Sequence, residues 1–454
     1  MPVETGASLR GLPSVPKVGG ALPFLGNIID MGRDTLGFLE KMARERGDIV
    51  GFQLGPRPAM LVSGPDEVEQ VLLKQHANFP KARFFWQSVE ALLGQGLLTS
   101  DGALWQKQRK LAAPAFAGQR LLSYGPVMVQ LAERVLGKWH DGQVLDVHPE
   151  MMAIGIRIAA KTFFDSEVEE DVAGISAATN DVIEEVAARF TRPILIPDAV
   201  PLPGHLRYTR AIKRVEKVIQ RIVAEQRAAQ NDKGDYLSML LMARDENGQP
   251  MSDVEIRDEV MTALAAGYET TAAALSWSLL LLGEHPEIQD RIAAELKEQI
   301  GDRPIAHEDL AKLSYLENVV IEAMRLYPPA WAVGRESKED TEVGGFFIPG
   351  GTTIIVSPWV THRNGRYYED PMEFRPERWA GDFRRKLPRF AYFPFGGGPR
   401  ICLGSRFAMM ETMLLLGTIV ARFSLERVPN KPVVPAPSIT LRPKGGIWLK
   451  IKAR

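Results

Sequence analysis

Residues 393–404 read Phe-Pro-Phe-Gly-Gly-Gly-Pro-Arg-Ile-Cys-Leu-Gly, and Cys402 within them is the only cysteine of the 454-residue chain. A single cysteine cannot form an internal disulfide, and zinc–thiolate sites and iron–sulfur clusters need several cysteines. One cysteine can supply the single axial thiolate of a haem iron. A lone cysteine is more often a small buried apolar residue, and a glycine-rich loop is more often an ordinary turn. The residues around Cys402 therefore have to decide between these interpretations.

Several features around Cys402 favour a ligand role. Glycine tolerates positive φ, so the loop can turn sharply and approach a flat cofactor, and its backbone N–H groups can point at the sulfur. Arg400 is close enough in sequence to reach a haem propionate. The apolar run at 407–420 predicts a helix whose N-terminal dipole stabilises a thiolate. A phosphate-binding loop is excluded, because Gly-Lys-Ser/Thr is absent.

Residues 395–404 match Phe-Gly-x-Gly-x-x-x-Cys-x-Gly. This string resembles the haem-binding signature of the cytochromes P450, and it is highly specific. The resemblance implies haem b, with Cys402 as the axial ligand of the iron and with Phe395, Gly396 and Arg400 in the cofactor site. It also implies a mainly α (α+β) fold, in which a large helical domain carries small β-sheets. The haem would lie between a long central helix and the cysteine loop.

Residues 253–283 give the longest helical pattern, and it is apolar on nearly all sides, as in a helix that crosses the centre of a large core. Charged and hydroxyl side chains in its middle argue against a membrane span. Its segment 266–270, Ala-Gly-Tyr-Glu-Thr, resembles the family's Ala-Gly-x-Asp/Glu-Thr. The resemblance implies that Thr270 and Glu269 organise proton delivery to oxygen. Gly267 would leave room for a ligand, and Thr270 can bond the carbonyl four residues earlier and distort the helix.

Glu322 and Arg325 lie one turn apart on a predicted helix and face the same way. Such a pair contributes little on an exposed helix, but it resembles the family's Glu-x-x-Arg, which joins an arginine from a later loop. Residues 374–379, Phe-Arg-Pro-Glu-Arg-Trp, match that loop and assign Arg378 as the third member. Trp379 occupies a position at which the family more commonly has phenylalanine. The implied role is a buried charge network that supports the cysteine loop.

Further candidates for haem contacts are basic or aromatic. Trp105 and Arg109 share a helical face, a pair that is more often a surface cation–π contact. Here they resemble the family's Trp-x-x-x-Arg, which implies binding to a haem propionate. Arg335 lies where the family often places another propionate contact. The loop residue His362 is expected to be structural.

Apolar residues from several segments are the candidates for a substrate pocket: Phe84, Phe85, Leu264, Ala266, Trp331, Val333 and Ile439. The aromatic stretch at 79–86 is either a mobile flap over this pocket or a satellite of the core. The proline-flanked apolar break at 193–197 is either the loop between two lid helices, as the resemblance implies, or a buried connector. The sequence does not separate these alternatives.

The remaining pattern predicts ordinary elements. They are a helix at 34–46, a β-hairpin of strands 49–54 and 59–63, a helix at 66–74, a largely helical region at 121–228, strands at 346–348 and 353–358, and final strands at 439–451. No linker rich in glycine, serine or charge divides the chain, so one haem domain is expected over 1–454, with an irregular N-terminal arm at 1–30.

Composition restricts the partners. A formal net charge of −1 gives no argument for nucleic acid. The N-terminus has neither the apolar core of a signal peptide nor the ~20 apolar residues of a membrane span. One cysteine fits a reducing compartment, so a cytoplasmic protein without a transmembrane anchor is expected.

The resemblance implies a monooxygenase, which inserts one atom of O₂ into an apolar small molecule by hydroxylation or epoxidation and releases the other as water. The substrate would be a fatty acid, terpenoid, steroid or polyketide. No flavin or nicotinamide motif is present, so electrons would come from a separate ferredoxin or flavodoxin with an NAD(P)H reductase. The basic run at 384–389 is usually a solvated face, but it could attract such an acidic donor. The alternatives are a peroxide-dependent peroxygenase or isomerase and a non-enzymatic haem sensor.

Overall fold

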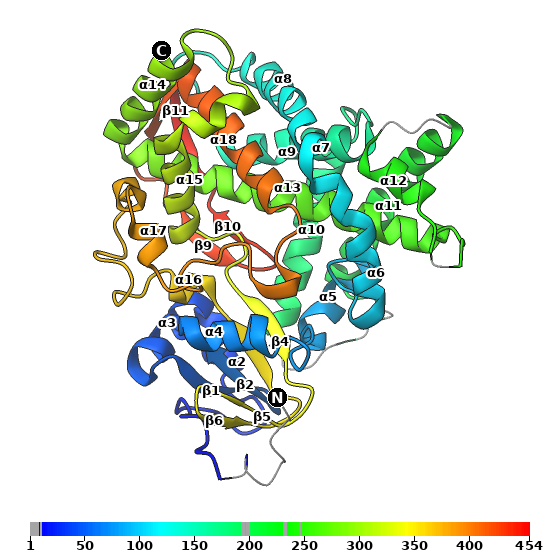
Figure 1. Ribbon diagram of the computed structural model, residues 1–454, viewed down its shortest axis with the longest axis vertical. Coiled ribbons are helices and arrows are strands. Elements are labelled where there is room, and N and C mark those ends of the chain that lie inside the picture. The colour runs from blue at the N-terminus through cyan, green and yellow to red at the C-terminus, as the bar shows by residue number, and fades with distance from the viewer. Residues whose placement is uncertain (1–8, 10, 192–195, 197–199, 230–233, 246) are drawn as a thin grey trace.

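The structure, a computed structural model, describes residues 9, 11–191, 196, 200–229, 234–245 and 247–454, and the side chains of Phe84, Phe190 and Thr191 lie outside this description. Figure 1 shows helices filling the upper and right parts of the molecule, while the first strands lie at the bottom near the N-terminus. Helices therefore dominate and the sheets are small, which confirms the predicted fold class.

The helices form three successive groups along the chain. The first group is α2 (Ile28–Arg33), α3 (Thr35–Arg46), α4 (Pro65–Glu69), α5 (Arg83–Leu93), α6 (Gly102–Ala112), α7 (Gly118–Ser123) and α8 (Gly125–Leu136). The second is α9 (Val147–Phe164), α10 (Val172–Thr191), α11 (Pro203–Ala229), α12 (Tyr236–Met242) and α13 (Asp253–Glu284). The third is α14 (Pro286–Ile300), α15 (Ser314–Leu326), α16 (Pro358–Thr361), α17 (Phe383–Lys386) and α18 (Ser405–Arg422).

Short helical turns connect these helices. A π-helical turn, η1 (Gln70–Lys74), extends α4, and four 3₁₀ turns follow: η2 (Ala113–Phe116), η3 (His307–Lys312), η4 (Pro376–Trp379) and η5 (Gly398–Arg400). The turn η5 directly precedes the cysteine.

The described residues also form four small sheets. The largest has the strand order β1 (Ile49–Leu54), β2 (Arg57–Val62), β7 (Thr353–Val356), β4 (Val333–Glu336). A second has the order β3 (Val144–Asp146), β11 (Trp448–Ala453), β8 (Phe423–Arg427). The two-stranded sheets pair β5 (Thr341–Val343) with β6 (Phe346–Ile348) and β9 (Val434–Pro437) with β10 (Leu441–Lys444).

The largest sheet joins the strands β1 and β2 near the N-terminus to the strands β4 and β7, which lie much later in the chain. β1 and β2 form the predicted antiparallel hairpin, in which Ile49 lies opposite Val62. β2 then pairs in parallel with β7, so that Val62 also lies beside Val356. β4 runs antiparallel to β7 at the other edge and carries Arg335.

The central helix α13 confirms the long helix predicted at 253–283. It begins with a capping box, in which Ser252 Oγ accepts the N–H of Glu255 at 3.2 Å and Glu255 Oε2 accepts the N–H of Ser252 at 2.8 Å. It ends just before Pro286, because the residue before a proline is disfavoured in the helical conformation. α9, α15, α18 and β8 pack around it, which explains why its apolar residues surround the helix axis.

Three predicted elements differ in the structure. The helix predicted at 66–74 changes from α to π at Gln70. The strand predicted at 353–358 ends at Val356, because Pro358 occupies the first turn of α16. The flap interpretation is wrong for Phe79, which is fully buried among the apolar residues of the largest sheet. The short strand β3 was missed within the predicted helical region.

The helical region breaks before Pro203, as predicted. The apolar loop predicted at 193–197 lies outside the described residues, apart from Ile196. Along the N-terminal arm, Lys17 forms an isolated bridge with Gly51, and α2 begins at Ile28. A search of the described helices finds none with the length and apolar character that a membrane span requires.

Candidate active site

The cysteine loop connects η5 to α18 and is held by its own backbone. The N–H of Cys402 donates to the carbonyl of Phe395 at 2.9 Å. The thiol is accessible, yet the protein around it displaces solvent and raises its pKa, while the N–H of Gly404 and the guanidinium of Arg109 act in the opposite direction. An accessible thiol that is nevertheless poorly solvated lies in a recess rather than on a convex surface.

Glycine is favoured at two positions of the loop for different physical reasons. Gly396 has φ 70° and open space around its α-carbon. Gly398 has φ 67°, and a β-carbon there would lie 1.8 Å from the carbonyl oxygen of Leu72 in η1. Gly398 is therefore required because the loop backbone lies directly against the π-turn, a contact that the sequence did not reveal.

A cluster of cations lies beside this recess. Arg335 is buried on β4, and Lys81 forms an isolated β-bridge with it. Burial and the neighbouring Arg400 lower the pKa of Lys81 to about 7 and that of Arg335 to about 10. Asp101 is the carboxylate of this cluster. It accepts the backbone N–H of Lys81 at 2.9 Å and pairs with Arg400.

Trp105 forms the aromatic wall of the cluster. Its ring lies 4.5 Å from the guanidinium carbon of Arg400 and 5.9 Å from that of Arg109. The tryptophan is buried, so the pair of Trp105 and Arg109 is not the surface contact that is commoner for such residues. The sequence analysis missed Lys81 and Asp101; only Asp101 left a signal, as a helix-capping residue immediately before Gly102.

These residues fit the haem that the resemblance implies. Within the described part of the chain, Nε and Nη1 of Arg400 are buried without a hydrogen-bond partner, which points to a missing anion. Several cations around one carboxylate suit the two propionates of haem. The one thiol, in the recess beside them, suits its iron.

The middle of α13 shows the predicted hydrogen bond from Thr270 to the carbonyl four residues earlier, within a continuous α-helix. Thr270 Oγ1 donates to the carbonyl of Ala266 at 2.9 Å, and Thr271 Oγ1 donates to that of Gly267 at 3.0 Å. Ala266 is exposed and Thr270 is partly exposed, so they share an accessible face of an otherwise buried helix. The interpretation of Gly267 is wrong, because a β-carbon there would lie 2.7 Å from the ring of Phe163 in α9. This glycine allows two helices to pack and does not leave room for a ligand.

Glu269 lies on another side of α13 from Thr270. Its carboxylate is buried and forms two hydrogen bonds with Arg442, from Nε to Oε1 and from Nη2 to Oε2, both at 2.6 Å. Thr440 Oγ1 donates to Oε1 at 2.7 Å. Burial raises the pKa of Glu269, but Arg442 and Thr440 outweigh it, so the pKa is lower than usual. In this conformation Glu269 is an ion-paired carboxylate and not a proton donor.

The substrate-pocket candidates occupy different environments. Leu264 is only 2% exposed in the main core and offers almost no surface, so its assignment to the pocket is wrong. Trp331 is also buried, and its indole N–H donates to the carbonyl of Ser438 at 2.9 Å. Ile439 is 36% exposed in the turn between β9 and β10. The side chain of Phe84 lies outside the described residues.

Two further candidates lie on β4 or against it. Val333 and Phe85 are both partly buried. The Phe85 ring packs against β4, because a β-carbon on Gly334 would approach it to 2.8 Å. Phe85, Val333 and the accessible Ala266 therefore come from α5, β4 and α13.

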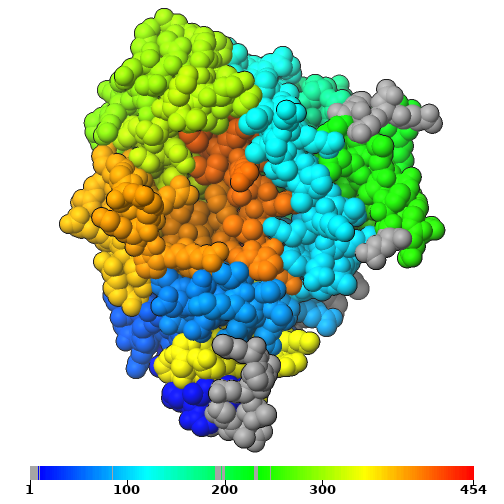
Figure 2. Space-filling view, in the orientation of Figure 1, coloured from blue at the N-terminus to red at the C-terminus, as the bar shows by residue number. Residues whose placement is uncertain are grey.

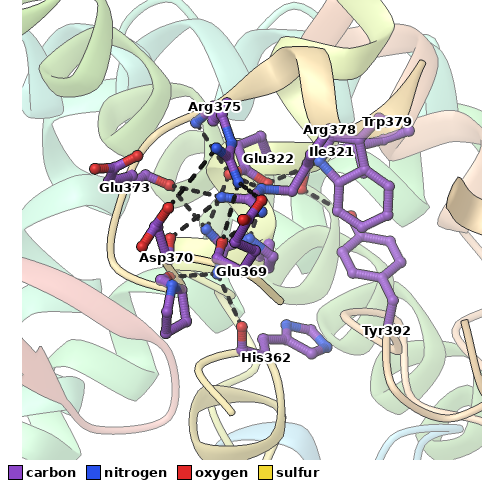
Figure 3. A network of polar contacts seen from close by, with 12 residues as sticks. Ile321, Glu322, His362, Glu369, Asp370, Glu373, Arg375, Arg378, Trp379 and Tyr392 are labelled. Atoms are coloured by element: carbon purple, nitrogen blue, oxygen red, sulfur yellow. Dashed lines mark hydrogen bonds and ion pairs between the residues drawn. The ribbon is translucent and has the colours of Figure 1, made fainter. Parts of the chain in front are cut away.

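Glu322 and Arg325 are completely buried, and Arg378 and Trp379 are nearly so. Figure 3 shows Glu322 at the centre of this charge network. Arg325 donates from Nε to Oε2 at 2.8 Å and from Nη2 to Oε1 at 2.9 Å. Arg378 Nε donates to Oε1 at 2.8 Å. Trp379, the departure from the commoner phenylalanine, donates its indole N–H to Oε2 at 2.8 Å. The backbone N–H of Arg375 also donates to Oε1 at 3.1 Å, so the tryptophan adds a fifth hydrogen bond to one carboxylate.

The network reaches the cysteine loop through two contacts. Arg325 Nη1 donates to the carbonyl of His362 at 2.9 Å, and the imidazole Nε2 of His362 accepts the N–H of Phe393 at 2.9 Å. Tyr392 donates its hydroxyl to the carbonyl of Ile321 at 3.1 Å. His362 is therefore structural, as expected, and it links the buried charges to the start of residues 393–404.

Another buried carboxyl group, that of Glu411 on α18, was not anticipated. Among the described residues neither of its oxygens has a hydrogen-bond partner. Burial raises its pKa to about 8, and only the neighbouring Thr271 opposes this rise. Glu411 is therefore protonated at neutral pH.

Glu411→Gln should change how stability depends on pH. Because the folded protein holds this proton with a pKa of about 8 and the unfolded chain with 4.5, the stabilisation is complete below pH 4.5 and is lost as the pH rises towards 8. Over that window the wild type should lose up to ~1.4 kcal/mol per pH unit relative to the glutamine variant. Chemical unfolding from pH 5 to 9 measures this difference, and parallel profiles would show that Glu411 is ionised.

Comparison with known proteins gives a consistent result. The family model described as "Cytochrome P450" matches residues 16–450. Cyclooctatin synthase of Streptomyces melanosporofaciens is 36% identical over 93% of this chain and 92% of its own length. Pentalenene oxygenase of Streptomyces avermitilis is 32% identical over 96% of both chains.

A solved structure extends the comparison to the fold. The cyanobacterial CYP120A1 with bound retinoic acid matches this chain with a TM-score of 0.85 and 30% sequence identity. The alignment covers 98% of this chain and 100% of the CYP120A1 chain. Sequence and structure therefore match from end to end. This chain belongs to the cytochrome P450 family and is a cytochrome P450 monooxygenase.

Proposed function

We propose that the chain forms one haem domain that binds haem b and oxidises a terpenoid, using electrons from a separate protein. The observation that carries this proposal is the recess in which the only thiol lies beside the cation cluster of Lys81, Arg335 and Arg400. Relatives named for cyclooctat-9-en-7-ol and pentalenene support a terpenoid over the fatty acid, steroid and polyketide alternatives. A cytoplasmic location belongs to the same proposal, because a single cysteine suits a reducing compartment.

Named residues would hold the cofactor. Cys402 would supply the thiolate ligand, and Arg335, Arg400 and Arg109 would bind the propionates beside Trp105. Phe395 and Gly396 would shape the loop around the thiolate. When bound, haem supplies the activation of O₂, which thiolate donation favours. The buried network of Glu322, Arg325 and Arg378 would keep the loop in place.

The chain itself would have to control protons and water. Thr270 lies on the accessible face of α13 and holds its hydroxyl hydrogen on the carbonyl of Ala266. Rotation about one side-chain bond would release this hydroxyl from the carbonyl, so that it could donate a proton to a ligand bound at this face of α13. Phe85, Val333 and Ile439 would present apolar surface to the substrate and limit the access of water.

Turnover conditions test the proposed function directly. Purified protein should convert a terpene with a ferredoxin, its reductase and NAD(P)H, and a screen of terpenes that monitors the haem spin state should find ligands. Turnover with peroxide alone would favour the peroxygenase alternative. Binding of haem without any turnover would favour a sensor.

Thr270→Ala should uncouple the reaction. The change removes one hydroxyl and few other atoms, so folding, haem uptake and substrate affinity should stay nearly unchanged. General acid–base groups contribute ~10²–10⁴-fold, and here much of the loss should appear as hydrogen peroxide released per NAD(P)H oxidised. Thr271→Ala is the matched control, because its neighbouring hydroxyl is buried. Unchanged product per NAD(P)H in Thr270→Ala would remove this residue from proton delivery.

The electron donor has a suitable surface behind the cysteine loop. A groove of about 360 Å³ is lined by Phe395 of the loop and by methionines of α18, with Arg384 and Arg406 among its lining residues. In Figure 2 the residues of α18 lie at the bottom of a hollow between the surrounding segments. Part of the basic run at 384–389 is neutralised, because Arg384 pairs with Glu317 at 3.7 Å and Arg389 with Glu69 at 3.5 Å.

Charge reversal at the groove should slow electron transfer. The rate of reduction by an acidic ferredoxin should fall as added salt shortens the Debye length to ~8 Å at physiological ionic strength. Arg406→Glu and Arg384→Glu should each lower the second-order reduction rate about tenfold at low salt, whereas Lys217→Glu on the distant surface of α11 should not. Stopped-flow reduction measures these rates, and rates insensitive to both salt and the groove variants would contradict this docking surface.

A further inference from the structure

Residues 438–442 comprise the turn between β9 and β10 and the first two residues of β10, and they are called the 438–442 turn below. They hold the carboxylate of Glu269. Arg442 and Thr440 supply three hydrogen bonds at 2.6–2.7 Å to its two oxygens. A bidentate guanidinium pair of this geometry is among the strongest polar contacts in proteins. Glu269 is the residue next to Thr270, so this turn controls the charge nearest to the proposed proton donor.

The same turn also contacts α10. Arg442 uses its remaining terminal nitrogen, Nη1, to donate to Asn180 Oδ1 at 2.7 Å. Ser438 Oγ donates to the carbonyl of Ile183 at 3.4 Å. The helix α13 also contacts α10 directly, because the hydroxyl of Tyr268 in α13 is hydrogen-bonded to that of Thr179 in α10. A movement of α10 would therefore pull on the guanidinium that pairs with Glu269.

The third contact of the turn is with the proposed substrate pocket. The carbonyl of Ser438 accepts the indole N–H of Trp331 at 2.9 Å. Ile439 is partly exposed, although its two neighbours Ser438 and Thr440 are buried. A ligand that pushes on Ile439 would therefore act on a short segment whose next residues hold Glu269.

The groups facing Glu269 are few. Arg442, His148 of α9 and Tyr268 are its charged or titratable neighbours. Burial and Arg442 lower the pKa of His148 to about 4, so this imidazole is neutral at pH 7, and its Nδ1 lies 2.9 Å from Ser276 Oγ. Arg442 is therefore the one cation that balances Glu269 within the described residues.

We propose that Arg442 and Thr440 are positioning residues of the monooxygenase reaction: the 438–442 turn keeps Glu269 in an ion pair until occupation of the apolar pocket, or movement of α10, loosens it. This inference rests on the proposed role of Thr270 and deepens it. In the paired state both carboxylate oxygens are occupied by donors, so Glu269 cannot accept a proton from solvent or pass one to Thr270. Loosening the pair makes the carboxylate available only when a ligand is in place, which would limit wasteful reduction of oxygen.

Infrared spectroscopy of the haem-loaded full-length protein tests the ion pair without turnover. Arg442→Gln removes the cation, so burial alone acts on Glu269 and the group should take up a proton near pH 7. A carboxylic-acid band should appear in Arg442→Gln and be absent from Arg442→Gln/Glu269→Gln. Arg442→Lys should restore the ionised form, and Lys444→Gln, an exposed change on the same strand, should have no effect. If Arg442→Gln shows no new acid band, the assigned control of Glu269 is wrong.

Two further measurements test the coupling. The probe is 4-phenylimidazole, an apolar azole whose nitrogen binds haem iron and whose ring fills the adjacent pocket. The carboxylate band of Glu269 is the one that disappears in Glu269→Gln. Saturating the wild type with 4-phenylimidazole should shift this band, and an unshifted band would overturn the coupling. Thr440→Val removes one hydrogen bond and is the milder variant if Arg442→Gln does not fold. It should lower product per NAD(P)H severalfold more at pH 6 than at pH 8, and equal values would also count against the proposal.

These experiments distinguish a failure of the inference from a failure of the proposed function. The infrared bands require only folded, haem-loaded protein, so they report on the ion pair even if no terpene is oxidised. Failure of turnover in the wild type would contradict the proposed function alone. A normal wild type with unaltered bands in every Arg442 and Thr440 variant would contradict the inference alone.

Discussion

Cys402→Ala should abolish the spectroscopic signature of thiolate haem, because the chain contains no second cysteine that could replace the ligand. The reduced, carbon-monoxide-bound wild type should show the red-shifted absorption typical of thiolate ligation. The variant should lack it and should lose more product formation than the ~10–100-fold that residues around a metal ligand typically contribute. Absorption spectra and product per haem measure both effects.

The fold of this variant should survive. The Cys402 thiol is accessible, and the hydrogen bond to Phe395 comes from the backbone N–H, which alanine keeps. Removing the sulfur therefore leaves no large cavity in the core. Circular dichroism and the unfolding midpoint provide this control. Cys402→Ser preserves the size of the side chain and should fail in the same way as alanine. Identical spectra for wild type and Cys402→Ala would exclude this residue as the ligand and contradict the proposed function.

Glu322→Ala should largely prevent recovery of folded, haem-loaded protein. The variant leaves the guanidinium groups of Arg325 and Arg378 buried without their common carboxylate, and it removes the acceptor of the Trp379 indole. Removing one partner of a buried ion pair typically costs ~3–5 kcal/mol. That is a large part of the ~5–15 kcal/mol by which proteins are usually stable.

The matched control lies on the same helix. Glu317 also lies on α15, but its side chain is partly exposed and its Oε1 lies 3.7 Å from Nη1 of Arg384, so Glu317→Ala should cost at most ~1 kcal/mol. Trp379→Phe should be intermediate, because it removes one of the five hydrogen bonds to the Glu322 carboxylate, worth ~1 kcal/mol. Denaturant midpoints and haem content measure the series. A Glu322→Ala protein with the wild-type midpoint would show that the network does not support the cysteine loop.

The sequence predicted what local patterns control. The long apolar segment before Pro286 and the Ser252 capping box define α13, and the spacing of Glu322 and Arg325 by one turn brings them together. The hairpin of β1 and β2 follows from alternation and a short turn. In each case the interacting residues lie within about one helical turn or one hairpin, so the physical cause is visible in the sequence.

Contacts between distant segments were not predictable in this way. Arg442 carries no mark that it pairs with Glu269, because the two are joined only when β10 packs on α13. Gly267 matches a motif, but the ring that occupies its space comes from Phe163, about one hundred residues earlier. Lys81 became a member of the cation cluster only because a β-bridge places it beside Arg335.

The parallel pairing of β2 with β7 has a consequence for how the protein is made. Val62 and its partner Val356 are separated by roughly 290 residues, and ribosomes add ~5–20 residues per second. The finished hairpin of β1 and β2 must therefore wait on the order of 15–60 s for its neighbour to be synthesised. During that time the unpaired edge and the apolar face around Met60 and Val62 are open to other chains. Slower translation or scarce chaperones should therefore reduce yield by aggregation of nascent chains, long before cofactor supply becomes limiting.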